Sequence, residues 1–264
     1  MTDHAGRRAA PRGVIGMVHL APLPGAPRWR GSMEEVIERA LADARALEDG
    51  GVDAVLVENY GDVPFFAGRL PAESVAGLTA AVVAVRGEVR VRVGVNALRN
   101  DAAAALAVAA ATGASFIRVN VHAGGMYTDQ GWIEGRAADT LRLRERLCPE
   151  VAILADVHVK HATPPPGVGL GEAARDAWER GLADALIISG AGTGEPTSLD
   201  HIRRVRDRLS DAPLIVGSGV TAETIAEVLA AADAAIVGTA LQRAGTGTVV
   251  ELAKVRRLVE AARH

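Results

Sequence analysis

The chain has 264 residues, of which 49% are hydrophobic and only 3% aromatic, so it can build one large core that must be aliphatic. Its formal net charge of −3 excludes a broad basic surface for nucleic acid or for a membrane. The single cysteine, Cys148, excludes an internal disulfide bond and is compatible with a reducing cytoplasm, where we expect the protein to be located.

The start of the chain does not resemble a secretory signal, because its apolar stretch is soon interrupted by Pro22 and Pro24. The most apolar segment, residues 102–111, is about half as long as a segment that spans a bilayer. We therefore expect no membrane insertion.

Short aliphatic runs alternate with longer amphipathic stretches along the whole chain. The runs predict strands at residues 14–20, 54–59, 91–96, 116–122, 152–158, 185–189, 214–217 and 234–237. The stretches between them predict helices at residues 33–48, 74–85, 102–111, 171–180, 199–209, 222–231 and 249–262. Strands that alternate with helices imply an α/β fold with a parallel sheet, whose buried strands are aliphatic throughout.

The number of strands favours a closed barrel over an open doubly wound sheet. Eight strand-then-helix units in a chain near the roughly 250 residues typical of the fold predict a single (β/α)₈ TIM barrel. An open nucleotide-binding sheet would carry Gly-x-Gly-x-x-Gly after its first strand, and this chain does not. We assign residues 1–12 to a flexible N-terminal tail and residues 13–264 to the barrel domain.

Glycine-rich turns follow the seventh and eighth predicted strands, at the face where this fold builds its active sites. Both turns precede predicted helices, where free backbone N–H groups favour an anion. A phosphate site is expected there on Gly217, Ser218, Gly219, Gly238 and Thr239. A third glycine-rich segment, with Gly192 and Thr193, is expected to cover the same ligand. The alternative is that these are merely tight turns between strand and helix.

The fifth predicted strand carries the richest polar cluster, Asp156, His158 and Lys160. Alternation along a strand puts the three on one side, so an acid, an imidazole and an ammonium would rise together from the barrel rim. This set can combine a general base with a charge stabiliser. Asp156 and His158, with Glu58 as a further candidate, can equally bind a divalent metal, and no other cofactor is indicated. A structural ion pair with solvated rim residues is the alternative.

Other strands also end in polar residues. Glu58 and His19 are candidates for catalysis, and Asn96, Asn120 and His122 are candidates for binding substrate. A carboxylate at the end of a barrel strand needs a partner, however. Arg92 and Arg118 have the parity to point into the barrel, so Glu58 and Arg118 are either catalytic residues or a structural pair.

Most of the few aromatic residues fall in loops that follow strands. The residues concerned are Trp29, Tyr60, Phe65, Phe66 and Trp132. They can stack on the ring of a ligand or bury a contact between subunits, and we expect a homo-oligomer.

Several long motifs in this chain resemble the BtpA/SgcQ family. The matching segments are VIGMVHLAPLPG at 14–25, ENYGDVPF at 58–65, GVNALRND at 94–101, RVNVH at 118–122, TDQG at 128–131, ADVHVKH at 155–161 and VGSGV at 216–220. The resemblance covers all but the first dozen and the last few residues. It implies a phosphate-binding barrel of the ribulose-phosphate type, and it adds weight to His19 and to Asp129 as site residues. It does not supply a substrate or a reaction.

The residues and the resemblance lead to two hypotheses. In the first, the protein is an enzyme acting on a phosphorylated sugar or nucleotide-like compound, by isomerisation, aldol-type cleavage or glycosidic-bond chemistry. Asp156 would be the general base or a metal ligand, and Asn96 and Asn120 would hold hydroxyl groups. Lys160 would stabilise an oxyanion; a Schiff base is not favoured, because Lys160 lies beyond the predicted strand end.

The second hypothesis is a non-catalytic assembly or stability factor for a membrane complex, as one of the family's names suggests. The sequence offers no basic amphipathic helix and no lipidation signal for docking to a membrane. The polar residues at the strand ends exceed what a scaffold requires, so we favour the enzyme.

Overall fold

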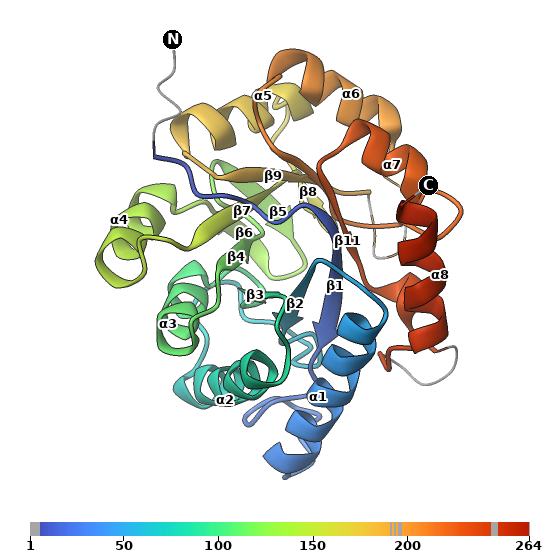
Figure 1. Ribbon diagram of the computed structural model, residues 1–264. Coiled ribbons are helices and arrows are strands. Elements are labelled where there is room, and N and C mark those ends of the chain that lie inside the picture. Colours follow the sequence, from blue (N-terminus) through green and yellow to red (C-terminus); the bar gives the residue numbers. More distant parts are fainter. Residues whose placement is uncertain (1–5, 191, 193, 195–196, 244–247, 264) are drawn as a thin grey trace.

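The computed structural model describes residues 6–190, 192, 194, 197–243 and 248–263. Eight parallel strands close into a barrel in the order β1-β2-β3-β4-β7-β9-β10-β11, and β11 pairs with β1 (Figure 1). Their bounds are Gly13–His19, Ala54–Glu58, Arg92–Asn96, Phe116–Val119, Ala152–Val157, Ala185–Ile188, Leu214–Val216 and Ala234–Val237. The predicted TIM barrel is confirmed, and six of the eight strands end one to three residues earlier than predicted.

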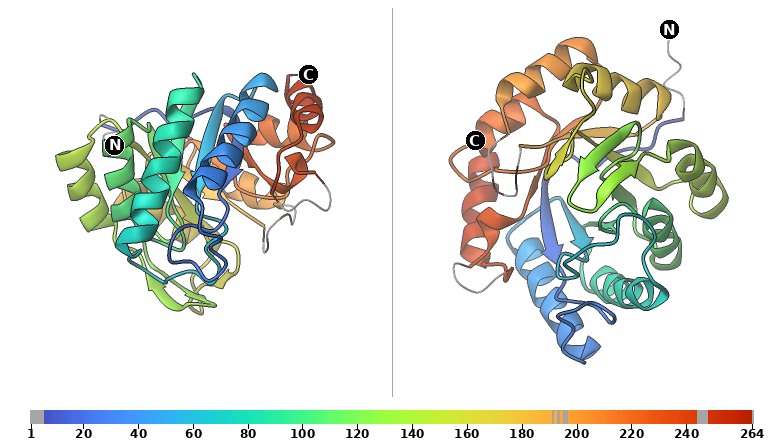
Figure 2. Two further views of the ribbon diagram at one scale, coloured as in Figure 1. Left: turned by 90° about the horizontal axis from the view of Figure 1, so that it is seen from below. Right: turned by 180° about the vertical axis from the view of Figure 1, so that it is seen from behind.

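Helices surround the barrel and bury the outward faces of its strands (Figures 1 and 2). The α-helices α1 to α8 span Met33–Asp49, Ala72–Glu88, Ala102–Thr112, Ala137–Leu147, Leu170–Arg175, Leu199–Arg208, Ile225–Ala231 and Leu252–Ala262. Helix α5 continues as a π-helix, Asp176–Arg180, and a 3₁₀ turn, Thr239–Leu241, follows β11. Helix α4 was not among the predicted helices, and α7 starts three residues later than predicted.

The inside of the barrel is a second, separate core of aliphatic side chains. Ile15, Leu56, Leu154 and Ile187 point inward and are fully buried. Phe116 lies among them, and it fits because its neighbour on β3 is a glycine. A Cβ atom at Gly94 would lie 2.1 Å from the Phe116 ring. The barrel is therefore filled, and only its mouth is free to hold a ligand.

A small antiparallel sheet, absent from the sequence prediction, lies beside the barrel mouth. Strands β5 (Gly125–Thr128) and β6 (Gly131–Glu134) form a hairpin in the loop after β4, and β8 (Ala162–Thr163) pairs with β5. Figure 2 shows this hairpin at the end of the barrel opposite the two termini. The sheet thus belongs to the catalytic face of the fold.

Residues 6–12, which the sequence assigns to the tail, run across the floor of the barrel. Arg7 donates hydrogen bonds to the carbonyl groups of Ala183 and Trp178, and its guanidinium lies 3.4 Å from the centre of the Trp178 ring. Arg92 donates to the carbonyl of Ala9 at 2.8 Å. Arg92 therefore lies at the floor, far from the barrel mouth where the sequence offered it as a partner for Glu58.

Within the described part of the chain, no helix combines the length and the apolar composition needed to cross a membrane.

Candidate functional site

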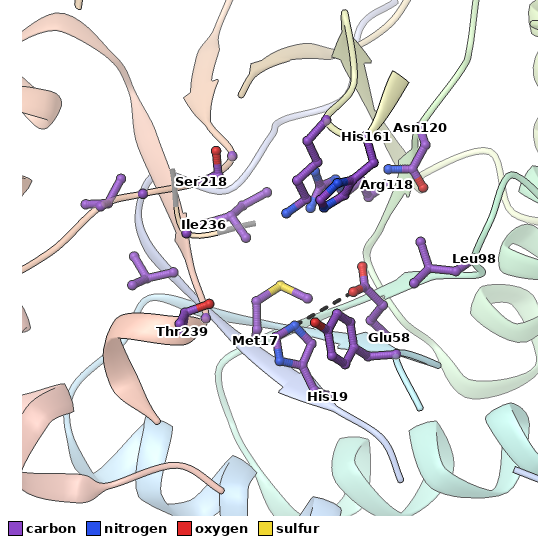
Figure 3. Close-up of a pocket in the computed structure, with 18 of the residues that line it drawn as sticks. Met17, His19, Glu58, Leu98, Arg118, Asn120, His161, Ser218, Ile236 and Thr239 are labelled. Atoms are coloured by element: carbon purple, nitrogen blue, oxygen red, sulfur yellow. Dashed lines mark ion pairs between the residues drawn. The ribbon is translucent and has the colours of Figure 1, made fainter. Parts of the chain in front are cut away.

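The barrel mouth holds a cavity of about 310 Å³ at the C-terminal ends of the strands. Figure 3 shows its two sides. One side, which we call the ionisable wall, carries His19, Glu58, Arg118, Asn120 and Lys160. The other side, which we call the cradle, consists of residues 217–221 after β10 and residues 238–240 after β11.

The register of the strands places four polar residues in one row across the ionisable wall. His19 on β1 lies beside Glu58 on β2, Glu58 beside Asn96 on β3, and Asn96 beside Arg118 on β4. Asn96 donates a hydrogen bond to Glu58 Oε2 at 2.6 Å. Glu58 and Arg118 are thus two strands apart, so they do not form the structural pair that the sequence left open.

His19 presents an N–H group to Glu58. Its Nδ1 accepts a hydrogen bond of 2.9 Å from the side-chain amide of Gln242, so the proton lies on Nε2, 3.7 Å from Glu58 Oε1 (Figure 3). Burial lowers the pKa of His19, an effect that Glu58 opposes and Lys160 reinforces. The ring of Tyr60 packs against His19 with 4.4 Å between the ring centres. A neutral imidazole and a carboxylate therefore face the cavity together.

Arg118 pairs with Asp156 instead of Glu58. Its Nε and Nη2 donate to Asp156 Oδ2 and Oδ1 at 2.7 and 2.8 Å, and both side chains are buried. Asn120 donates to Oδ2 at 3.1 Å, and Ser189 to Oδ1 at 3.4 Å. Both carboxylate oxygens are therefore engaged below the cavity surface, an arrangement that disfavours the predicted role of Asp156 as a general base.

Lys160 lines the cavity from the loop after β7. Its carbonyl accepts a hydrogen bond of 2.7 Å from Arg99, a cavity residue that the sequence reading did not single out. Burial lowers the pKa of Lys160, and the nearby Arg118 lowers it further. Arg99 is itself buried, with 6% of its surface exposed, and burial lowers its pKa too.

Three of the proposed site residues lie away from this cavity. His158 has a left-handed backbone (φ 51°), so the strand alternation breaks there and its side chain is not part of the cavity wall. The ring of His122 is buried and its Nε2 lies 2.8 Å from the Gly181 carbonyl, toward the π-helix. Asp129 is exposed at the turn of the β5–β6 hairpin, where it accepts a hydrogen bond from Gln130. Strand β7 ends at Val157, which is why Asp156, His158 and Lys160 do not form one row.

The cradle is built largely from backbone. Gly217, Ser218, Gly219, Gly238 and Thr239, the residues expected to bind phosphate, all line the cavity. Among the described residues, no acceptor faces the backbone N–H groups of Gly219, Val220, Thr239 and Ala240. The hydroxyl of Ser218 is already engaged by the N–H of Gly190 at 2.8 Å. Since α7 begins only at Ile225, the available donors are loop amides and not the first turn of a long helix.

The glycine segment after β9 is described only in part. Gly192 is buried and is not part of the cavity wall, whereas Gly194 lines it. Thr193, which the sequence places among the phosphate ligands, lies outside the described residues.

The structure does not gather the candidate metal ligands. Asp156 is held by Arg118, His158 is turned away, and Glu58 stands beside His19 and Asn96. Within the described ranges, no group of three His, Cys, Asp or Glu side chains lies close enough together to hold a metal ion.

The chain is a (β/α)₈ barrel. Backbone amides of loops and ionisable side chains line one pocket at its mouth. The sequence profile of the BtpA family matches residues 10–264, and the chain belongs to this family.

Relatives match over nearly their whole length. An uncharacterized protein of Thermococcus kodakarensis is 47% identical over 95% of both chains. The photosystem I biogenesis protein BtpA of Synechocystis is 45% identical, over 94% of this chain and 87% of the relative. The putative sgc region protein SgcQ of Escherichia coli is 30% identical, over 96% of this chain and 95% of the relative.

Solved structures share the fold at low identity. Phosphoribosyl anthranilate isomerase from Thermus thermophilus has a TM-score of 0.59 at 15% identity, over 95% of this chain and 98% of that chain. Tryptophan synthase from M. tuberculosis has a TM-score of 0.64 at 20% identity, over 96% and 94%. At this identity the likeness shows the barrel fold alone.

Proposed function

We propose that this protein is an enzyme that acts on a phosphorylated sugar or nucleotide-like compound. One observation carries the proposal: a single cavity has, on one wall, backbone N–H groups without an acceptor among the described residues and, on the other, ionisable side chains. Structural neighbours support the proposal. They include phosphoribosyl anthranilate isomerase and thiamine phosphate pyrophosphorylase, and both names refer to a phosphorylated compound.

The cradle suits a phosphate group in shape and in charge. Backbone N–H groups that converge on a concave loop bind anions without a side chain. Gly219 supplies the turn, with φ of 70°. Lys160, Arg118 and Arg99 give three positive charges near the cavity against two negative ones on Glu58 and Asp156, a net charge of +1 while His19 is neutral. An anionic group therefore balances the site.

The ionisable wall supplies the proton-transfer groups. Glu58 is the carboxylate that faces the cavity, with one oxygen held by Asn96 and the other directed at His19. It takes the role of general base that the sequence gave to Asp156, and the N–H of His19 donates to a developing charge. Asn120 offers a buried Oδ1 with no partner among the described residues, a place for a substrate hydroxyl.

A second hollow gives room for the rest of a larger substrate. It adjoins the cavity through Tyr60 and Val63, which line both. Arg28, Trp29 and Arg39 line its far side. An aromatic ring beside guanidinium groups favours a planar, anionic moiety, as in a nucleotide-like compound.

Calorimetric titration tests the cradle. We expect ribose 5-phosphate and inorganic phosphate to bind, and ribose to bind far more weakly. Thr239→Glu adds a negative charge to an exposed position of the cradle and should abolish phosphate binding. Ala107→Glu adds the same charge to an exposed position on α3 and should not. Equal binding by the two variants, or no response to any phosphate ester, would refute the proposed function.

The second hypothesis, an assembly factor, draws on the name of the Synechocystis relative. It predicts that Glu58→Gln and Thr239→Glu leave the cellular role intact, because a scaffold does not use the cavity. A homo-oligomer located in the cytoplasm, without nucleic acid, stays a prediction that size-exclusion chromatography and cell fractionation test.

A further inference from the structure

The chain contains 27 arginines but only two lysines, Lys160 and Lys254. Lys254 lies on α8, donates to the carbonyl of Gln242 at 2.6 Å and lies 3.6 Å from Glu251. Lys160 lines the cavity instead, and among the described residues its ammonium has no hydrogen-bond partner. Arginine serves nearly every other basic position, but it cannot lose its proton in a protein, whereas a buried lysine can. The residue type at position 160 therefore points to chemistry that needs a free amine.

The surroundings of Lys160 favour the neutral amine. The side chain is half-buried in the cavity wall, where burial and the charges of Arg118 and Arg99 lower its pKa. The charges of Glu58 and Asp156 oppose this effect. A lysine next to cationic groups in a desolvated pocket is activated as a nucleophile.

The backbone on both sides of Lys160 is held in an uncommon conformation. His158 and His161 both have positive φ values, 51° and 56°. Non-glycine residues in this region are strained, and such strain is concentrated at active sites. Arg99 fixes the Lys160 carbonyl from the opposite side of the loop. The chain thus departs from regular strand geometry at the point where Lys160 enters the cavity.

We propose that Lys160 forms an imine with a carbonyl group of the substrate, so that the substrate is a phosphorylated aldehyde or ketone. This inference rests on the proposed function, because the cradle holds the phosphate while Lys160 meets the carbonyl. It favours isomerisation or aldol-type cleavage over hydrolysis of a glycosidic bond, because an imine forms directly on a free carbonyl group. It also replaces the role as oxyanion stabiliser that the sequence suggested for Lys160.

The step balances in protons and electrons. Glu58 takes one proton from the Lys160 ammonium, and the amine nitrogen then forms a bond to the carbonyl carbon as the C=O π electrons move to oxygen. A proton moves from nitrogen to that oxygen, and Glu58 returns its proton as the hydroxyl group leaves as water. The sum is one ammonium and one carbonyl giving one iminium and one water. The iminium then accepts electrons when a neighbouring C–H or C–C bond breaks, as isomerisation or aldol-type cleavage requires.

Pyridoxal 5′-phosphate is a suitable probe, since it carries both an aldehyde and a phosphate. The full-length protein is incubated with it, reduced with borohydride and mapped by mass spectrometry, which separates adducts at Lys160, Lys254 and the N-terminal amine. We expect an adduct at Lys160 at neutral pH, formed faster than at Lys254, because the lowered pKa of Lys160 leaves more of its amine neutral. Lys160→Arg should abolish this adduct, and Lys254→Arg should leave it unchanged.

Pyridoxal without phosphate separates the two proposals. If both are right, pyridoxal 5′-phosphate labels Lys160 faster than pyridoxal does, and inorganic phosphate protects it. Equal labelling by both aldehydes supports the amine and refutes the cradle. Binding of inorganic phosphate without any adduct at Lys160, or an adduct equally abundant at Lys254, overturns the imine and leaves the proposed function standing. The same reduction with glyceraldehyde 3-phosphate should give a Lys160 adduct as well.

Discussion

The two walls of the pocket are made in different ways. The cradle presents backbone amides from residues close together in the chain, after β10 and β11. The ionisable wall presents side chains from β1, β2, β4 and the loop after β7, whose pairings join residues 36 to 38 positions apart. The first wall therefore has a fixed set of donors at every pH, whereas the second depends on long-range pairing and on protonation. The predictions below separate the two walls, from the largest expected effect to the smallest.

Asp156→Asn tests how far the ionisable wall depends on its buried ion pair. The change leaves Arg118 buried without a negative partner, so we expect the free energy of unfolding in urea to fall by about 3–5 kcal/mol. Glu223→Gln breaks an equally short pair with Arg257 that is exposed, and it should leave the urea midpoint unchanged. Similar behaviour of the two variants would show that the Arg118–Asp156 pair does not organise the wall.

His19→Gln tests the pH dependence of the ionisable wall. Burial lowers the pKa of His19 in the folded protein below its unfolded value of 6.5, so the unfolded chain binds the extra proton. Stability from this group is complete above that value and is lost as the pH falls toward the folded pKa, by at most ~1.4 kcal/mol per pH unit. We expect the variant to lose less stability than the wild type between pH 7 and pH 5.5. A cradle variant such as Gly219→Ala should keep the wild-type slope.

Gly219→Ala tests the cradle. Gly219 and Gly113 have nearly the same left-handed backbone, with φ of 70° and 73°. Alanine at either position should cost about 1 kcal/mol of unfolding free energy. Only the change at Gly219 should weaken the binding of inorganic phosphate, by roughly tenfold, because it displaces amides that donate to a charged group. Equal phosphate affinity in both variants would place the anion elsewhere.

Glu58→Gln tests the electrostatic coupling of Glu58 to Lys160 within the ionisable wall. Glu58 and Asp156 raise the pKa of Lys160, against burial and the charges of Arg118 and Arg99 that lower it. Without the charge on Glu58 that pKa falls further, so the pH midpoint of labelling by pyridoxal 5′-phosphate should move to lower pH. An upward move would show that Glu58 does not act on Lys160.

The barrel was predictable because its strands and helices carry regular patterns. Parallel strands buried on both faces appear as aliphatic runs, and the runs at 54–59 and 234–237 match β2 and β11 within one residue. The position of the cradle at the barrel mouth was predictable as well, because the turns that follow the strands of this fold all lie at that end of the barrel. The β5–β6 hairpin was not, because its four-residue strands mix glycine, polar and aromatic residues.

The ionisable wall was predictable in its residue types but not in its pairings. Sequence parity placed Arg118 and Glu58 on the same side of the sheet, but only the register shows that Asn96 lies between them. Beyond Val157, odd and even positions no longer predict which side of the sheet a side chain occupies, because the left-handed conformation of His158 ends the alternation. Arg99, Ser189 and Gln242 gave no local signal, and the structure alone brings them to the site.

The small sheet beside the mouth connects the segment around Lys160 to the tryptophan side chain of Trp132. Strand β8 begins two residues after Lys160 and pairs with β5, whose Tyr127 stacks on Trp132 of β6 with 4.8 Å between ring centres. Trp132 is partly exposed, so its fluorescence depends on how the hairpin meets solvent. A change in the backbone at Lys160 is therefore expected to move the paired strands β8 and β5 and so to alter the surroundings of the Trp132 indole. We therefore expect the binding of a ligand in the pocket to change the intrinsic fluorescence of the protein.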